Sequence, residues 1–211
     1  MFKEILLQKQ SLTRYYQNQF SRSIRLEGSG IDLGAKSMNA PYYNFLDMSR
    51  VTHMTFVDYY SSGEDIVQMD LEQEILAEDN SFDFVIAFNL LEHIYDFQSL
   101  MKEIFRVLKP GGIVHIITPF LHKYHPDPND YWRFTTAAME KSLLLSGFSN
   151  SVEARPISGG RFQALATGLP LPNPLYALSC SLLLFLDWLE NRFGSDKSIW
   201  YPHSIYATAK K

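Results

Sequence analysis

The 211-residue chain has a single cysteine, Cys180, so it can form no internal disulfide bond. This cysteine lies in the apolar segment 178–182, without neighbours at metal-ligand spacing. A buried and inert thiol is therefore favoured over a nucleophile.

An excess of positive charge is also missing. Nineteen Lys and Arg residues stand against 23 Asp and Glu residues, which gives a net charge of −4. Because no overall positive field is present to attract a phosphate backbone, nucleic acid is not expected as a partner.

The N-terminal region has no uninterrupted apolar core, because charged residues interrupt it: Lys3, Glu4, Lys9 and Arg14. A secretory signal peptide is not expected, and a cytoplasmic location is.

The most apolar run, 175–186, is shorter than the about 20 residues that span a bilayer. Asp187 and Glu190 are expected to end it. We expect 175–189 to form a buried core helix or a subunit contact, such as a homodimer. A helix lying on a membrane surface is the alternative, which would make the protein membrane-peripheral.

Short apolar runs alternate with helical patterns along the chain. Strands are predicted over 31–33, 54–57, 66–69, 82–88, 113–117, 152–157 and 205–209. Helices are predicted over 2–20, around Leu100 and Ile104, and over 135–145. The pattern favours an α/β fold, a doubly wound and mostly parallel sheet with helices on both faces. The strand over 205–209 is expected to close the sheet edge.

The predicted organisation is a single domain over 1–211. It has an N-terminal helical extension over 1–27 and a helical insertion over 161–200 before the last strand.

Polar residues follow four successive predicted strands, namely Asp32, Asp58, Asp70 and Asn89. In a doubly wound sheet, ligands bind outside the carboxyl ends of the strands. A carboxylate at Asp58 can accept two hydrogen bonds from a ribose diol, and one at Asp70 can meet an adenine amino group. Each residue alone reads more readily as a cap or turn residue. Together the four indicate a nucleoside site.

Residues from about 30 to 148 resemble the Rossmann-type S-adenosylmethionine-dependent methyltransferases. The most specific segments are 82–94, FDFVIAFNLLEHI, and 105–112, FRVLKPGG. The resemblance implies a seven-stranded sheet with an antiparallel last strand and S-adenosylmethionine as cofactor. It implies these cofactor-binding residues: Asp32, Gly34, Ala35, Lys36, Asp58, Tyr59, Asp70, Leu71 and Asn89.

The glycine loop departs from the family pattern Asp-x-Gly-x-Gly-x-Gly, since the segment 32–38 reads DLGAKSM. Lys36 either reaches the cofactor carboxylate or blocks its site. Gly28 and Gly30 are expected to precede the first strand, whereas a dinucleotide fingerprint follows it. A nicotinamide-dependent oxidoreductase is therefore disfavoured.

A long loop over 118–135 follows the fifth predicted strand and is expected to overhang the acceptor site. His125 is the candidate general base, His122 its rival, and Asp130 the residue that orients it. Trp132 and Phe134 are expected to pack the loop.

The predicted substrate contacts are His93, Tyr131 and Arg133, with Arg133 able to hold an anionic group. A metal site is not expected. His122, His125 and Asp127 have tolerable ligand chemistry, but no cysteine or third histidine supports them.

The loop element over 125–135 resembles a methyltransferase subgroup associated with glycan and surface-polysaccharide assembly. The function expected from the resemblance is methyl transfer to a small-molecule or glycan-linked acceptor, such as a sugar. The depleted glycine loop and the apolar segment 175–189 keep an alternative open. In that alternative the chain is a catalytically inactive, methyltransferase-like partner subunit.

Overall fold

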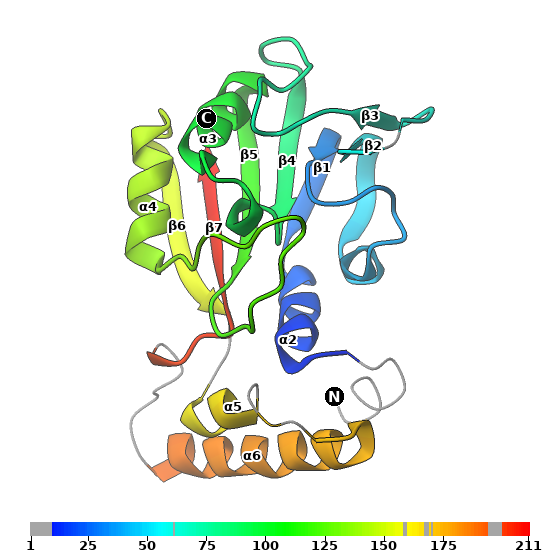
Figure 1. The fold of residues 1–211 in the computed structure, drawn as a ribbon. Helices are drawn as coiled ribbons and strands as arrows, with labels where there is room; N and C mark the ends of the chain where they lie inside the picture. Colours follow the sequence, from blue (N-terminus) through cyan, green and yellow to red (C-terminus); the bar gives the residue numbers. More distant parts are fainter. Residues whose placement is uncertain (1–9, 61, 158–159, 167–168, 170, 194–199) are drawn as a thin grey trace.

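A seven-stranded sheet forms the centre of the molecule (Figure 1). The computed structural model describes residues 10–60, 62–157, 160–166, 169, 171–193 and 200–211. The strands are β1 (Arg25–Asp32), β2 (Asp47–Asp58), β3 (Ile66–Gln68), β4 (Phe82–Phe88), β5 (Leu108–Pro119), β6 (Asn150–Ile157) and β7 (Ser204–Lys210). Their order is β3-β2-β1-β4-β5-β7-β6. Strands β1 to β5 pair in parallel, and β7 runs antiparallel to both of its neighbours. The predicted α/β sheet is confirmed.

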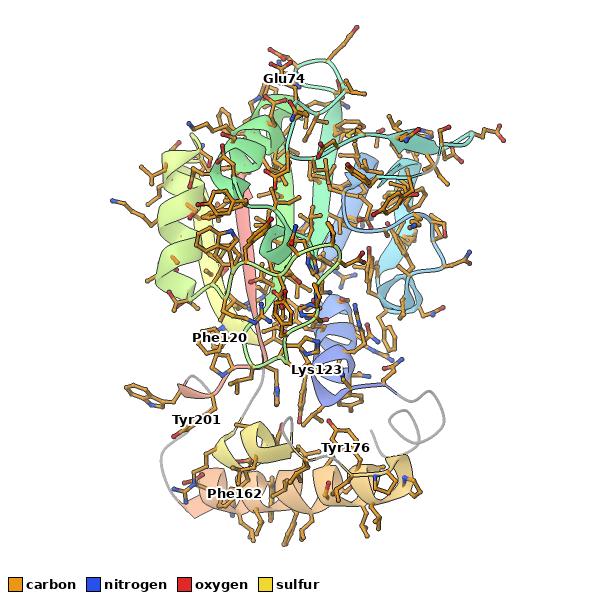
Figure 2. All side chains as sticks on the ribbon, in the orientation of Figure 1. Glu74, Phe120, Lys123, Phe162, Tyr176 and Tyr201 are labelled. Carbon is orange, nitrogen blue, oxygen red and sulfur yellow. The ribbon has the colours of Figure 1, made fainter. Side chains whose placement is uncertain are left out.

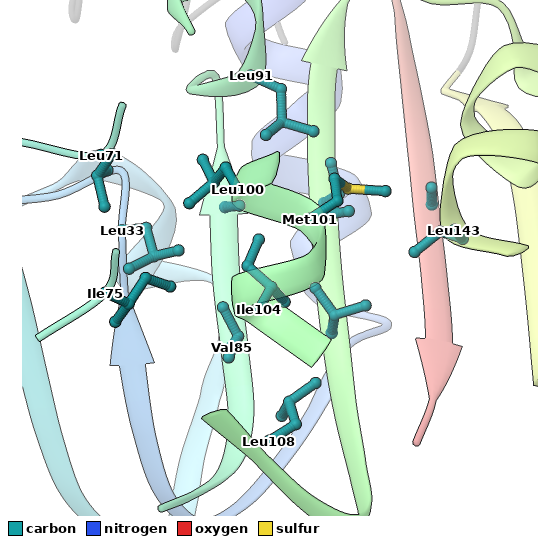
Figure 3. Packing of buried hydrophobic residues seen from close by; sticks show 14 of the residues in the cluster. Leu33, Leu71, Ile75, Val85, Leu91, Leu100, Met101, Ile104, Leu108 and Leu143 are labelled. Carbon is teal, nitrogen blue, oxygen red and sulfur yellow. The ribbon is translucent and has the colours of Figure 1, made fainter. Parts of the chain in front are cut away.

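Helices α3 (Phe97–Val107) and α4 (Thr136–Leu145) cover one face of the sheet. The carboxylate of Asp96 accepts a hydrogen bond from the backbone N of Ser99 at 3.2 Å and so caps the start of α3. The apolar residues of α3 then recur on one side and pack on the sheet (Figure 3): Leu100, Met101, Ile104 and Val107. The opposite face is covered by α2 (Leu12–Ser21) and by the short 3₁₀-helix η1 (Pro41–Asn44).

The connections between the first four strands consist of loops and one 3₁₀-helix in their described residues. Among the described residues of 33–46, 59–65 and 69–81 there is no α-helix. The expected alternation of strand and crossover helix is therefore wrong for this half of the sheet. Instead, the buried rings of Tyr42 and Tyr43 in η1 pack directly on the sheet.

Two predictions about the strands need correction. Gly28 and Gly30 lie inside β1, not before it. Gly28 has φ +86° at a shift in the pairing register, and a β-carbon on Gly30 would lie 2.1 Å from the ring of Phe84. Strand β7 does not close the sheet edge, because it is inserted between β5 and β6.

Helices α5 (Arg161–Ala166) and α6 (Asn173–Phe193) lie together beyond the ends of the strands, at the bottom of Figure 1. Asp187 ends the apolar run, and helix α6 continues beyond it to Phe193. The buried carboxyl group of Asp187 accepts hydrogen bonds from the backbone N of Phe162 at 3.1 Å and of Gln163 at 2.9 Å. Asp187 thus satisfies the free amides at the start of α5 while α6 continues past it.

Helix α6 has one buried and one exposed apolar side. Cys180 is buried and packs with Leu12 of α2, which confirms the expected buried thiol. On the other side, a row of side chains projects away from the body of the molecule (Figure 2). Five large apolar residues, each more than half exposed, form what we call the α6 stripe: Leu175, Leu178, Leu182, Phe185 and Trp188. A fully buried core helix is therefore wrong for this side. No helix in the described part of the chain is long and apolar enough to cross a membrane.

His203, just before β7, is fully buried and stacks on Tyr16 with ring centroids 5.3 Å apart. Burial lowers its pKa to about 4. The unfolded chain takes up a proton near pH 6.5, so the fold loses stability as the pH falls from about 6.5 to about 4. We expect His203→Phe to reduce the loss of unfolding free energy between pH 7 and pH 5 by about 2 kcal/mol. Urea titrations at the two pH values measure this difference.

The exposed residue His53 provides the matched control, and His53→Phe should keep the acid sensitivity of the parent chain. An unchanged pH dependence in His203→Phe would show that this ring does not remain neutral in the fold.

Candidate functional site

A pocket of about 580 Å³ opens at the carboxyl ends of β1, β2, β3 and β4. Eight of the nine predicted cofactor residues line it: Gly34, Ala35, Lys36, Asp58, Tyr59, Asp70, Leu71 and Asn89. The structure thus brings together the tips of four neighbouring strands, as the sequence predicts. What these residues bind stays a prediction at this point.

Asp32 is the exception, because it lies beneath the pocket and is fully buried. The hydroxyl groups of Tyr42 and Tyr43 donate to its Oδ2 at 2.7 and 2.6 Å, and the backbone N of Gly34 donates to Oδ1 at 2.8 Å. Burial raises the pKa of Asp32 to about 6, although these hydrogen bonds oppose the rise. Asp32 therefore anchors the β1–β2 connection and does not itself line the pocket.

Gly34 lies where this connection passes closest to β4. A β-carbon at this position would be 2.6 Å from the carbonyl oxygen of Phe88. Only glycine allows this backbone approach, which brings the next two residues to the pocket wall.

Lys36 and Asp58 form an ion pair with Nζ and Oδ1 3.1 Å apart. The carboxyl group is 5% exposed and the lysine side chain 66% exposed. Lys36 thus reaches the predicted ribose-binding acid from the solvent side. Because the ammonium group stays hydrated, the pair contributes little to stability.

Asn89 turns the chain at the end of β4 with φ +51°, a conformation that asparagine tolerates better than most residues. Its side-chain amide exchanges two hydrogen bonds with Gln17 of α2, at 2.7 and 3.2 Å. Gln17 also donates to the hydroxyl group of Ser204 in β7 at 2.9 Å. No pattern in the sequence indicates this contribution of α2, because the partners are far apart in the chain.

Asp70 holds the turn after β3. Its Oδ1 accepts the backbone N of Glu72 at 3.0 Å, and Glu72 in turn accepts the backbone N of Tyr95 at 2.8 Å. These bonds fix Asp70 and Leu71 at the pocket wall.

The loop after β5 is anchored to the 3₁₀-helix η2 (Leu91–His93) and the residues after it. The backbone N of Tyr131 donates to the carbonyl of Glu92 at 2.7 Å, and Trp132 Nε1 donates to the carbonyl of Ile94 at 3.1 Å. Phe134 is buried in the core, and Trp132 packs against the same cluster. The expected packing role of these two aromatic residues is confirmed.

This loop supplies one wall of the pocket through these residues: Asp127, Pro128, Asn129 and Tyr131. Of the predicted substrate contacts, His93 and Tyr131 line the pocket and Arg133 does not. Arg133 pairs instead with both carboxylate oxygens of Asp130, with Nη2 2.7 Å from Oδ2. This pairing lowers the pKa of Asp130.

The three predicted catalytic residues, His122, His125 and Asp130, lie behind the pocket wall and do not line it. Glu92, followed by Asp130, raises the pKa of His125, whose Nδ1 lies 3.1 Å from Asp130 Oδ2. Burial lowers the pKa of His122 to about 4, which makes it the weaker base. Their catalytic roles stay predictions.

Among the described residues, one group has the spacing of metal ligands, and it consists of Glu92, His93 and His125. The set considered from the sequence, His122 with His125 and Asp127, does not form such a group there. Sequence reasoning missed Glu92, which appeared only as one letter of a motif.

A second pocket, of about 750 Å³, lies at the opposite edge of the sheet. Its charged residues pair with one another: Arg25 with Asp47 at 3.0 Å, Lys109 with Asp83 at 2.8 Å, and Arg50 with Glu27 at 3.6 Å. Since the strand-tip residues lie at the carboxyl edge, that edge is the candidate functional site.

Comparison with known proteins agrees with this assignment. Residues 28–116 match the family model described as a methyltransferase domain. The fold is similar to the crystal structure of an S-adenosylmethionine-dependent methyltransferase from Mesorhizobium loti, with a TM-score of 0.58 and 13% sequence identity. That similarity covers 95% of this chain and 99% of that chain.

Curated relatives match over shorter segments. A 70-residue segment is 39% identical to sterol 24-C-methyltransferase ERG6A of Gibberella zeae, covering 33% of this chain and 18% of that protein. A 56-residue segment is 39% identical to a probable S-adenosylmethionine-dependent methyltransferase of Mycolicibacterium smegmatis, covering 25% and 22%. The matches therefore span about a fifth of these relatives.

The close approach of Gly34 to β4 is testable. We expect Gly34→Ala to lower the free energy of unfolding by about 1–3 kcal/mol, because the added β-carbon meets a backbone oxygen that cannot move freely. Gly63→Ala is the control, since its nearest neighbour would be Ile66 Cδ1 at 3.6 Å. Urea unfolding measures both, and equal stability of the two variants would contradict the packing described.

Proposed function

We propose that this chain is an S-adenosylmethionine-dependent methyltransferase and that it methylates a small-molecule or glycan-linked acceptor, because residues 28–116 match the methyltransferase-domain model. The observation that carries the proposal is the convergence of the strand-tip residues on one pocket. A chain with the same fold but without that pocket would have no site for a methyl donor, because function depends on the site and not on the fold alone.

The pocket suits the methyl donor in size and in chemistry. Its volume of about 580 Å³ falls within the range of roughly 300–1,000 Å³ that small-molecule sites occupy. Asp58 is placed to accept the ribose hydroxyl groups, and Asp70 with Leu71 to meet the adenine. We assign the backbone after Gly34 to the remainder of the donor and Asn89 to the side of its reacting centre, because both line the pocket.

Bound S-adenosylmethionine supplies a methyl group on a sulfonium, which is a good leaving group. The protein therefore has mainly to align the acceptor with that group, and such positioning can contribute about 7–11 kcal/mol. His93 and Tyr131 line the pocket and are the acceptor contacts we propose. A base is needed when the acceptor is a hydroxyl group, and His125, whose ring lies 5.1 Å from that of His93 and whose pKa is raised, is the candidate we propose.

The acceptor class rests on the loop segment 125–135 and its resemblance to methyltransferases of glycan assembly. Two relatives are named as sterol 24-C-methyltransferases. We do not assign a sterol acceptor to this chain, because the matched segments cover less than a fifth of those proteins. The cytoplasmic location remains a prediction from the sequence.

One specific observation favours a second candidate, a catalytically inactive partner subunit. Lys36 takes the position of a family glycine and pairs with Asp58, the residue that the donor ribose would need. In this candidate the ion pair persists and the donor does not bind.

Calorimetric titration with S-adenosylmethionine separates the two candidates. We expect Asp58→Ala to weaken donor binding by about 10- to 100-fold, because a charged acceptor for the ribose is lost. Asp65→Ala, an exposed acid in the following connection, is the control and should bind as the parent chain does. No binding by the parent chain at millimolar donor would favour the inactive subunit. Equal donor affinity of the parent chain and Asp58→Ala would show that the ribose does not bind at Asp58.

We propose that a second copy of this chain covers the α6 stripe. Helices on anionic membrane surfaces carry many Lys and Arg residues on their polar side, whereas Arg192 is the only basic residue of α6. A helix–helix contact between copies buries the stripe without that charge requirement.

Sedimentation over a range of protein concentrations tests this contact. We expect the parent chain to dimerise and Leu182→Glu to stay monomeric, because a charge would be buried at the contact. Leu145→Glu on α4 changes a residue of similar exposure elsewhere and should dimerise normally. A monomeric parent chain that floats with phospholipid vesicles would show that a membrane covers the stripe instead.

A further inference from the structure

Glu92 is an acidic residue buried within the described part of the chain. Its side chain is fully buried in η2, and within the described residues neither carboxyl oxygen has a hydrogen-bond partner. Burying a carboxyl group without partners is costly, and such groups in folded proteins call for a specific explanation.

Two histidines turn the same ring nitrogen toward this carboxyl group. Glu92 Oε1 lies 3.8 Å from Nε2 of His93 and 3.7 Å from Nε2 of His125. One ligand atom from each of the three residues lies within 4.8 Å of the others. Ligand atoms around a tetrahedral zinc ion are about 3.4 Å apart, given bonds of about 2.1 Å. The arrangement is thus slightly wider than a closed metal site.

The other nitrogen of each histidine is held by an oxygen acceptor. Nδ1 of His93 contacts the carbonyl oxygen of Asn129, and Nδ1 of His125 lies 3.1 Å from both the carbonyl oxygen of Lys123 and Asp130 Oδ2. Because these oxygens accept hydrogen bonds, each Nδ1 donates and each neutral ring keeps its lone pair on Nε2. Outer carboxylate and carbonyl groups orient metal-binding histidines in this way. Arg133 fixes the carboxylate of Asp130 in turn.

We propose that Glu92, His93 and His125 bind a divalent transition-metal ion. Two imidazole nitrogens and one carboxylate oxygen are the ligand set of catalytic zinc sites, and imidazole disfavours Mg²⁺ and Ca²⁺. Three protein ligands leave a position for a further ligand. From the sequence we expected no metal site, and this proposal revises that expectation.

Positive groups also face Glu92, and the ion must compete with them. Arg14 of α2 and Arg133 of the loop both attract the carboxyl group electrostatically, and neither donates a hydrogen bond to it.

The use of the ion in catalysis rests on the proposed function. His93 lines the donor pocket, so the ion would lie at the acceptor side of its wall. A cation there lowers the pKa of an acceptor hydroxyl group. With the ion bound, His125 is a ligand and not the base. The proton of the hydroxyl group leaves to solvent, the oxygen electron pair forms the bond to the methyl carbon, and the pair of the breaking C–S bond goes to sulfur.

Calorimetric titration with Zn²⁺ tests the site in the whole chain after chelator treatment, without methyl donor. We expect one site per chain in the parent protein, and at least 100-fold weaker binding in Glu92→Gln and His93→Ala. His122→Ala is the matched control, because His122 lies in the same loop with its ring 4.5 Å from that of His125, yet outside the ligand group. That variant should bind Zn²⁺ as the parent chain does.

A second measurement needs no variant. Co²⁺ added to the metal-free parent chain should give the visible absorption of a four- or five-coordinate ion, and Zn²⁺ should displace it. If Zn²⁺ does not bind in the titration and Co²⁺ gives no visible absorption, the proposed site is overturned. Equal Zn²⁺ affinity in the parent chain and in Glu92→Gln also overturns it. Donor binding is measured separately. A failure of metal binding with normal donor binding rejects this inference alone, and the reverse result rejects the proposed function alone.

Discussion

The buried carboxyl group of Asp32 is the interaction on which the candidate site depends. No α-helix supports the connection between β1 and β2, so this connection is held by the hydrogen bonds that Tyr42, Tyr43 and Gly34 donate to Asp32. These hydrogen bonds connect the end of β1 to the tyrosine rings that pack on the face of the sheet. Because these bonds hold the connection on its buried side, the opposite side of the connection is available to line the pocket.

The opposite wall of the pocket is formed by the loop after β5, which is held in place in a different way. The loop after β5 has no regular structure between Pro119 and Thr136, and it is positioned by side chains that anchor it to η2 and α3. Trp132 and Phe134 bind the loop to the core, and the backbone of Tyr131 bonds to Glu92. The same anchoring brings His125 beside Glu92 and His93. The packing of the loop and the assembly of the proposed metal site are thus one arrangement.

The sequence predicted β4 over 82–88 correctly, and it predicted that four strand tips meet, because strand alternation and chain order determine which ends share an edge. It could not predict the position of Gly28 and Gly30 within β1, since the reason is the ring of Phe84 on the neighbouring strand. The burial of Glu92 was equally invisible. It depends on a loop some 35 residues further along the chain, and residues at that separation show no local pattern.

A crystal structure of the chain with the demethylated donor, S-adenosylhomocysteine, tests the central claim most directly. The account predicts a nucleoside at the carboxyl edge, with the ribose against Asp58, the adenine near Asp70 and the sulfur toward the wall that carries His93. Density for the nucleoside in the pocket at the opposite edge, or a ribose away from Asp58, would contradict it.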